Sequence, residues 1–392
     1  MNNNSIYTLQ FMLLCFSGFL FFSSFNMIIP ELPSHLETMG GGDYKGLIIA
    51  LFTLTAGLSR PFSGKLADRV GRVPVMIVGA IVCGVAGVLY PFANTLWAFF
   101  LLRLFHGFST GFKPTGTSAY VADIIPLNKR GEAMGVLGFF GSMGMAAGPS
   151  IGPLIAKHFS LDIMFYTSAF FAVLSVLILI GMKETLKNTE RVGWKHFVVR
   201  KEEIYEPRVL SPSIMMMLLV FAFGAIVTVI PDISDQMGLS NRGLFFTYFT
   251  IASLMVRLLA GKASDKYGRV PVLKVGSAIL LAALLLLANA NSAFLLLTTA
   301  VLYGVGVGMC SPTIFAWTID LSDDKHRGRG MATMYIFLEI GIGMGALLGG
   351  WVYGNDLSNI PIVFYTCAVC IVTALIYLFS KTVRNLPRVN EI

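Results

Sequence analysis

The stretch that decides the fold is Gly64-Lys65-Leu66-Ala67-Asp68-Arg69-Val70-Gly71-Arg72-Val73-Pro74-Val75. It places two glycines, one aspartate and three cations within nine residues, between two long apolar segments. The pattern returns 197 positions later as Gly261-Lys262-Ala263-Ser264-Asp265-Lys266-Tyr267-Gly268-Arg269-Val270-Pro271-Val272. The sequence therefore predicts two related halves, each turning at a polar hairpin whose two glycines permit tight turns.

The composition indicates an all-α membrane protein. Of the 392 residues, 55% are hydrophobic and only 13% are charged, against about 25% charged in soluble domains. Apolar segments long enough to cross a bilayer recur along the chain, and a segment without water around it must satisfy its backbone as a helix. We predict twelve transmembrane helices, at Leu9–Ile29, Gly46–Ser63, Val75–Phe92, Leu96–Val121, Ala133–Ala156, Ile163–Met182, Ile214–Ile230, Leu244–Ala260, Leu273–Ala288, Ala293–Ile319, Met331–Val352 and Pro361–Ser380.

The repeat extends well beyond the hairpins and divides the chain into two six-helix halves. We predict an N-terminal half at 1–182, a cytoplasmic linker at 183–211 and a C-terminal half at 212–392. The residues that return with the same offset of 197 are Gly107, Gly111, Asp123, Arg130, Gly131, Gly144, Gly148 and Gly152, matched by Gly304, Gly308, Asp320, Arg327, Gly328, Gly341, Gly345 and Gly349.

The distribution of cations predicts the topology. Alternate loops and the C-terminal tail hold 22 Lys and Arg, whereas the opposite loops hold three, Lys45, Lys157 and Arg242. Because positive residues mark the cytoplasmic side, both hairpins and both termini are predicted to be cytoplasmic. The same alternation argues against nucleic acid as the reason for the net charge of +8. The first apolar segment is interpreted as a spanning helix and not as a removable signal.

Composition and motifs give little support to metal, cofactor or enzyme chemistry. All five cysteines lie in apolar segments, and the Cys367-x-x-Cys370 pair has no His, Asp or second pair beside it, so core packing is the favoured interpretation. Hydrolase, metalloprotease and P-loop signatures do not occur. We expect no cofactor, no bound metal and no enzyme activity.

Over its full length the chain resembles transporters of the major facilitator superfamily, whose loop motif between the second and third helices matches the hairpin. The resemblance implies alternating access between two halves, and a role for the hairpin in the conformational switch. We therefore predict a conformational latch, in which Asp123 is an available partner for Arg72. A plain positively charged loop is the alternative. The predicted latch residues are Gly64, Asp68, Arg69, Gly71, Arg72, Asp123, Arg130, Gly261, Asp265, Gly268 and Arg269.

The fourth predicted helix carries polar residues on one face. Their spacing of 3, 4, 3, 4 and 3 confines them to one sector of a helix: Arg103, His106, Thr110, Lys113, Thr117 and Tyr120. Cations within a spanning helix are costly and usually face a cavity or a partner, although their long side chains can also reach toward the membrane surface. Arg103-x-x-His106-Gly107 resembles the family's Arg-x-x-Gln-Gly motif, which implies a role in proton transfer.

The fifth predicted helix resembles the antiporter motif of the family's proton-driven exporters. It contains Gly135, Gly144, Gly148, Pro149 and Gly152. Small residues one turn apart permit close helix approach, and proline frees a backbone carbonyl. Generic small-residue packing is the alternative.

Glu339 is the one acidic residue near the middle of a predicted span. Such a carboxyl can carry a proton, or it can pair with the cations of the fourth helix. We place it in the substrate and proton pathway with the fourth-helix residues and with Asn26, Glu31 and Tyr335.

These observations predict a twelve-helix drug:proton antiporter of the bacterial inner membrane that exports a small organic molecule. Its partners would be the substrate, protons and the lipid bilayer, and we expect a monomer. A proton-coupled importer of a sugar or organic acid, and an exporter of a metal-chelating metabolite, are the alternatives.

Overall fold

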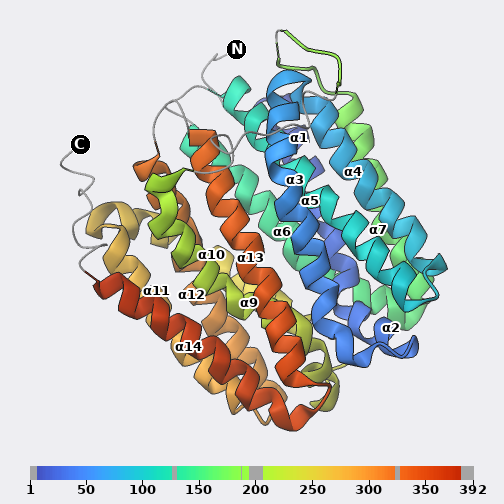
Figure 1. The fold of residues 1–392 in the computed structure, drawn as a ribbon, viewed down its shortest axis with the longest axis vertical. Helices are drawn as coiled ribbons and strands as arrows, with labels where there is room; N and C mark the ends of the chain where they lie inside the picture. The colour runs from blue at the N-terminus through green and yellow to red at the C-terminus, as the bar shows by residue number, and fades with distance from the viewer. Residues whose placement is uncertain (1–6, 126–129, 187, 194–205, 323–326, 381–392) are drawn as a thin grey trace. The chain divides into compact units, whose positions relative to one another are not determined.

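A computed structural model describes residues 7–125, 130–186, 188–193, 206–322 and 327–380 (Figure 1). Within these ranges the chain is helical. Twelve α-helices have 18 residues or more: α1 (Leu9–Ile28), α3 (Lys45–Arg69), α4 (Arg72–Leu89), α5 (Leu96–Ile124), α6 (Arg130–His158), α7 (Leu161–Ile180), α9 (Leu210–Gln236), α10 (Leu244–Tyr267), α11 (Arg269–Ala288), α12 (Ala293–Leu321), α13 (Arg327–Tyr353) and α14 (Ile360–Phe379). The shorter elements are α2 (Leu32–Thr38), η1 (Ile29–Glu31), η2 (Gly42–Tyr44), η3 (Tyr90–Phe92), η6 (Pro207–Val209) and η7 (Leu357–Asn359).

Ten of the described helical segments are long and apolar enough to cross a membrane, and α10 makes an eleventh if its two parts form one span. α5 is not among them, although it is 29 residues long. It carries Arg103, His106 and Lys113 within its length. The chain is thus an all-helical, multi-pass membrane protein, and the count of twelve spans and the cytoplasmic termini stay predictions.

The chain forms two compact units. Unit 1 comprises Met1–Leu32 and Leu54–Arg200, and unit 2 comprises Pro33–Thr53 and Lys201–Ile392. The units therefore differ from the predicted halves at one place, because the segment that contains α2 and the first part of α3 groups with unit 2. The assignment of residues 1–182 and 212–392 as transport halves stays a prediction.

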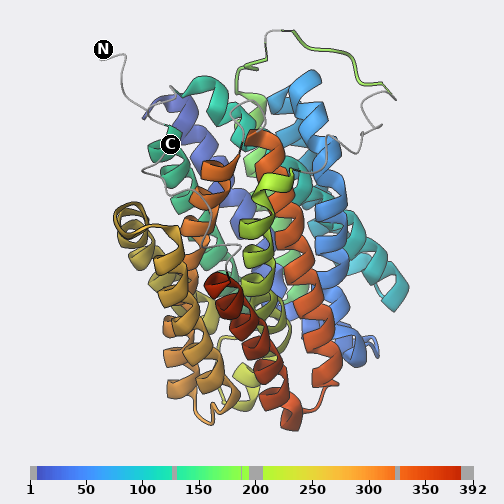
Figure 2. The same cartoon turned by 60° about the vertical axis from the view of Figure 1, so that its left-hand side comes forward.

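Helix packing within one unit recurs within the other. In unit 1, α1 packs on α6 and α7, and α4 packs on α5 and α7 (Figure 1). In unit 2, α9 packs on α13 and α14, and α11 packs on α12 and α14, which are the yellow-green to red helices of Figure 2. The sequence repeat is therefore also a repeat of helix neighbours.

Hydroxyl side chains cap the N-termini of several helices. Thr8, Thr95, Ser160 and Ser292 each accept a hydrogen bond from a backbone amide three residues later, at the starts of α1, α5, α7 and α12. Such caps satisfy a donor that the helix itself leaves unpaired.

The two polar hairpins are shorter than the sequence predicted. α3 continues through Gly64 to Arg69, so only Val70 and Gly71 separate it from α4. Gly71 makes the turn with φ 147°, whereas Gly64 lies inside a helix, and its predicted role in a tight turn is wrong. In the second copy Gly268 alone separates α10 from α11, with φ 89°. The physical reason is that glycine is tolerated within a helix, and each helix breaks only at the glycine that adopts a positive φ.

Candidate functional site

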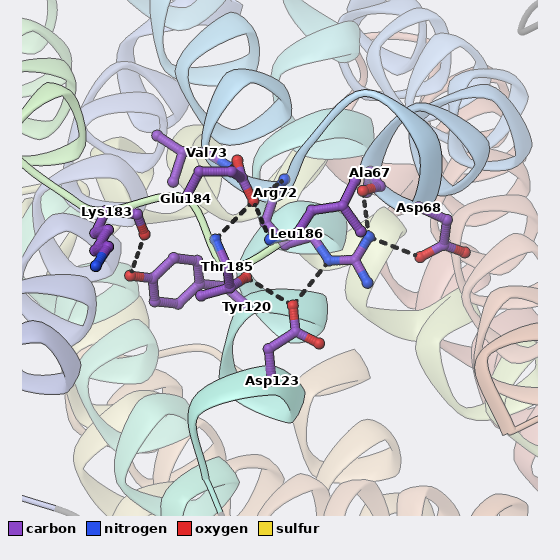
Figure 3. Close-up of polar contacts among 10 residues, drawn as sticks. All are labelled: Ala67, Asp68, Arg72, Val73, Tyr120, Asp123, Lys183, Glu184, Thr185 and Leu186. Atoms are coloured by element: carbon purple, nitrogen blue, oxygen red, sulfur yellow. Dashed lines mark hydrogen bonds and ion pairs between the residues drawn. The ribbon is translucent and has the colours of Figure 1, made fainter. Parts of the chain in front are cut away.

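The first hairpin is centred on the guanidinium of Arg72 (Figure 3). It forms an ion pair with Asp68 on the preceding turn at 3.1 Å, and a second with Asp123 at the end of α5 at 3.0 Å. It also donates to the carbonyl of Ala67. A planar guanidinium with five fixed donors can hold three acceptors at once. Arg72 therefore ties together the end of α3, the start of α4 and the end of α5.

Glu184 caps the start of α4, a contact that the sequence analysis did not identify. Its carboxylate accepts hydrogen bonds from the backbone amides of Arg72 at 3.1 Å and Val73 at 3.0 Å (Figure 3). These amides are among those that a helix start leaves unpaired, and the helix dipole favours a negative charge there. A Cβ on Gly71 would lie 2.6 Å from a carboxylate oxygen of Glu184. Glycine at position 71 is thus required both by its φ angle and by this acid.

The beginning of the predicted linker folds back on the hairpin. Thr185 donates to the Asp123 carboxylate at 2.6 Å, and the Tyr120 hydroxyl donates to the Lys183 carbonyl at 2.8 Å (Figure 3). Further along, Glu190 pairs with Arg69 at 3.0 Å. Arg72, Asp123, Thr185, Leu186 and Asn188 line a cavity of about 430 Å³ at this point. The contacts of the predicted latch residues therefore include linker residues as well as the hairpin.

The second hairpin repeats the geometry of the first. Arg269 pairs with Asp265 at 2.5 Å and with Asp320 at 2.8 Å. Where the first copy uses the Ala67 carbonyl, the second uses the hydroxyl of Ser264 at 2.8 Å. Each arginine side chain is 12% exposed, so the two copies are also equally enclosed.

The structure shows no tight contact at the predicted latch residues Gly64 and Gly261, and it does not describe the side chain of Arg130. Gly64 and Gly261 lie in helices, and a Cβ on either would meet nothing within 4 Å. Arg130 begins α6, and its side chain lies outside the described residues.

The polar face of α5 lies inside unit 1 and begins a chain of buried side chains. Arg103 donates to the Tyr90 hydroxyl at 3.0 Å, and that hydroxyl is 3.2 Å from Nδ1 of His106. On the other side of the ring, Nε2 is 3.4 Å from the Cys83 sulfur, which is 3.3 Å from the Ser24 hydroxyl. All five side chains are buried. This series of hydrogen-bonding side chains joins α5 to η3 through Tyr90, to α4 through Cys83 and to α1 through Ser24. These three partners were not predicted.

Lys113 lies about two turns beyond His106 on α5 and contacts neutral groups. Its ammonium donates to the Ser17 carbonyl at 3.2 Å and lies 4.9 Å from the centroid of the Phe21 ring. A cation over an aromatic face is attracted by the ring's quadrupole. Thr110 and Thr117 donate to carbonyls of their own helix. Tyr120 donates to the Lys183 carbonyl, as described above, and its place in the pathway stays a prediction.

Glycines of α6 pack against the backbone of α1. A Cβ on Gly144 would lie 2.5 Å from the Phe19 carbonyl oxygen, and one on Gly148 would lie 2.6 Å from that of Ser23. A Cβ on Gly152 would collide with the Met27 carbonyl. Gly135 has open space instead. Pro149 lies within this helix. Three of the four motif glycines are thus required by helix contact.

The remaining pathway residues occupy both units. Glu339 of α13 is 7% exposed and belongs to unit 2, as does Tyr335, whose ring lies 5.7 Å from that of Phe315. Asn26 donates to the Phe22 carbonyl within α1, and Glu31 lies in η1. The predicted pairing of Glu339 with cations of α5 stays a prediction. No group of three or more His, Cys, Asp or Glu that could hold a metal occurs among the described residues.

Fold and site together define a class of protein, a duplicated helical membrane protein with an arginine-centred hairpin in each repeat. The sequence model of the Major Facilitator Superfamily matches residues 14–256 and 213–392 of this chain. The chain belongs to the Major Facilitator Superfamily.

Curated relatives align with nearly the whole chain. It is 28% identical over 395 residues to the multi-drug resistance efflux pump PmrA of Streptococcus pneumoniae, with 96% of each chain covered. It is 26% identical over 376 residues to the multidrug resistance protein MdtG of Escherichia fergusonii, with 92% of this chain and 90% of the relative covered.

Solved structures share the fold at lower identity. The D-xylose-proton symporter has a TM-score of 0.80 at 15% identity, covering 94% of this chain and 96% of its own. The human organic anion transporter MFSD10 has a TM-score of 0.73 at 19% identity, covering 94% and 98%.

Proposed function

We propose that the chain exports drug-like organic molecules across a bacterial inner membrane in exchange for protons, by alternating access. The observation that carries the proposal is the alignment of nearly the whole chain with proteins named as multidrug efflux pumps. The glycine face of α6 against α1 supports it, because this face coincides with the antiporter motif that the sequence resembles.

The buried groups of the two units have the chemistry that a proton-coupled exporter needs. In unit 1, His106 lies within a series of hydrogen-bonding side chains that begins at Arg103. In unit 2, Glu339 is a nearly buried carboxyl in the predicted middle of a span. Proton entry at a membrane potential of about 150 mV supplies about 3.5 kcal/mol per charge, which sustains a substrate gradient of a few hundred-fold.

In the proposed cycle the two hairpins hold the cytoplasmic helix ends in one conformation. Arg72 and Arg269 each bridge two acids, so movement of α5 or α12 away from the hairpin breaks ion pairs. Proton binding and substrate binding at the buried groups compete, and this competition couples the two fluxes.

The proposal is tested in proteoliposomes that contain the purified full chain and an imposed pH gradient. Cationic dyes and antibiotics are expected to move against the proton flux, and Glu339→Gln is expected to abolish the coupling. Uptake of a sugar or organic acid with the proton would refute export, and full proton-coupled transport by Glu339→Gln would refute the role of this carboxyl. Transport confined to metal-chelating molecules would favour the alternative exporter.

A further inference from the structure

The imidazole of His106 lies at the centre of the buried series of hydrogen-bonding side chains in unit 1. The members of this series are, in order, Arg103, Tyr90, His106, Cys83 and Ser24. Nδ1 of the ring faces the Tyr90 hydroxyl at 3.2 Å, and Nε2 faces the Cys83 sulfur at 3.4 Å. The ring is fully buried. Which of its nitrogens carries a proton therefore depends on what these two partners donate and accept.

The Tyr90 hydroxyl decides which ring nitrogen is the acceptor. Among the described residues, the hydrogen-bond partners of this hydroxyl are Arg103 and His106. A guanidinium can only donate, so the hydroxyl oxygen accepts from Arg103 and has its single proton left for the imidazole. Nδ1 of His106 must therefore accept, because a second donor at this place would leave the buried phenolic proton without an acceptor.

The hydrogen bonds beyond the ring run in the same direction. A neutral imidazole that accepts at Nδ1 carries its proton on Nε2, which donates to the Cys83 sulfur. Farther along, the Ser24 hydroxyl donates to the Ser168 carbonyl at 2.7 Å, so Ser24 Oγ accepts from the Cys83 thiol at 3.3 Å. Ser168 donates its own hydroxyl proton to the Ser24 carbonyl at 2.8 Å. Each ring, thiol and hydroxyl proton of the series thus has an acceptor.

Neither end of the series can exchange a proton. Arg103 begins it with a guanidinium, which stays protonated in proteins, and the Ser168 carbonyl that ends it is an acceptor without a proton of its own. A proton passed along the series would have to be replaced from the arginine. The series can therefore hold its members in place, but it cannot conduct protons from one end to the other.

A second proton on the ring would disrupt these hydrogen bonds. It would sit on Nδ1 and face the hydroxyl that already accepts from Arg103. It would also add a positive charge at a buried site close to a guanidinium, and both burial and a like charge disfavour the charged form. The ionisable neighbours of the series include Arg103 and Lys113 of α5, Tyr90 of η3 and Cys83 of α4. Both charged members of this set are cations, while α1 and α7 contribute hydroxyls.

We infer that His106 is a fixed, neutral positioning residue that holds Arg103 through Tyr90, and that its ring does not carry the coupled proton. The ring accepts the phenolic proton, and this orients the hydroxyl oxygen toward the guanidinium nitrogen at 3.0 Å. The role in transport rests on the proposed function, whereas the charge state of the ring does not. The coupled proton then passes through other groups, of which Glu339 is the proposed one.

The first test records the nitrogen resonances of the ring in the full chain labelled with 15N-histidine. Replacing His35, His196 and His326 by glutamine leaves His106 and His158 as the histidines of the chain, and His158→Gln then assigns the two sets of signals. We expect His106 to show the neutral Nε2–H form at pH 7.5 and the same form at pH 5.0. His158 is exposed and is the matched control. Its signals are expected to shift, because an exposed imidazole normally gains a proton in this range.

The second test separates a positioning group from a proton carrier by measuring dye export in proteoliposomes. A glutamine side chain offers an acceptor oxygen and amide donors but does not take up a proton, whereas leucine offers neither donor nor acceptor. We expect His106→Gln to keep proton-coupled export within about threefold of the unaltered chain, with the same pH profile, because its amide can replace both ring contacts. His106→Leu should slow export at least about fivefold, because Tyr90 and Cys83 lose their buried partner. His158→Gln should have no effect.

A protonated His106 ring at pH 5.0, or the Nδ1–H form at either pH, would overturn the inference. So would dye exchange without proton coupling in His106→Gln, because it would show that the ring itself carries the proton, and so would full export by His106→Leu. Should His106→Leu fail to fold, the ring spectrum and the glutamine variant still decide. Absence of export by the unaltered chain would contradict the proposed function alone, whereas a protonated ring in a chain that exports would contradict this inference alone.

Discussion

Replacing Glu184 by alanine tests whether the linker is part of the predicted latch. The carboxylate accepts four backbone hydrogen bonds, from Arg72, Val73, Thr185 and Leu186. Two of these cap α4, and loss of a helix cap costs about 0.5–2 kcal/mol. The charge beside the helix dipole adds about 0.3–1 kcal/mol. We therefore expect the start of α4 to be weakened by about 2 kcal/mol.

The measurement is amide hydrogen exchange of the purified chain, which reports local opening. A change of about 2 kcal/mol corresponds to a roughly thirtyfold loss of protection, and we expect it at the amides of residues 72 and 73. The middle of α4 should be unchanged. The loss of protection in Glu184→Gln should lie between that of the unaltered chain and that of Glu184→Ala, since glutamine retains an acceptor oxygen but not the charge.

Glu190→Ala is the matched control, because Glu190 also joins the linker to the hairpin. Its partner Arg69 is 61% exposed, and an exposed pair contributes about 0.2–1 kcal/mol. The control should reduce protection less than fivefold. Equal exchange in the two variants, or unchanged exchange in Glu184→Ala, would refute the cap as the connection between linker and hairpin.

Three further predictions concern unit 1. Gly148→Ala should destabilise the purified chain by about 1–3 kcal/mol through overpacking and should reduce dye export. Gly135→Ala, with open space around its Cβ, should change neither stability nor export. Thermal unfolding and efflux assays measure the two effects, and equal effects of the two variants would contradict the close α1–α6 contact. Tyr90→Phe should lower stability by about 1–3 kcal/mol, because it leaves buried polar partners unsatisfied, and should slow proton-coupled export. Tyr166→Phe, at an exposed position, should change neither stability nor export. An unchanged unfolding temperature of Tyr90→Phe would argue against the buried hydrogen bonds around Tyr90. Arg72→Lys should reduce the export rate several-fold at unchanged expression, because an ammonium lacks the rigid fork that bridges two acids; wild-type transport rates would show that charge alone suffices.

The residues of the candidate site differ in how far the sequence could predict them. The Arg72–Asp123 contact was predictable because both residues recur at one offset, as Arg269 and Asp320, and because both lie at helix ends that short loops bring together. Glu184 has no such signal. It is one acid among several in a polar segment, and its role depends on how the chain folds back after α7.

For the polar face of α5, too, the sequence predicted some residues and not their partners. Helical periodicity placed Arg103, His106 and Lys113 on one face, and the structure buries all three. Periodicity does not indicate which helix lies opposite, so Tyr90 and Cys83 were not foreseen as partners.

The sequence by itself determined the membrane environment, the two related halves, the helical segments and the position of both hairpins. Hydropathy and repeated motifs are local properties of the chain, and the bilayer allows an apolar segment few conformations besides a helix. Tertiary structure alone decided the length of the hairpins, the cap supplied by Glu184, the buried chain around His106 and the burial of Lys45. These features depend on contacts between residues far apart in the chain, such as Lys45 with Asp232 and Asn355, and no local pattern encodes which distant groups will meet.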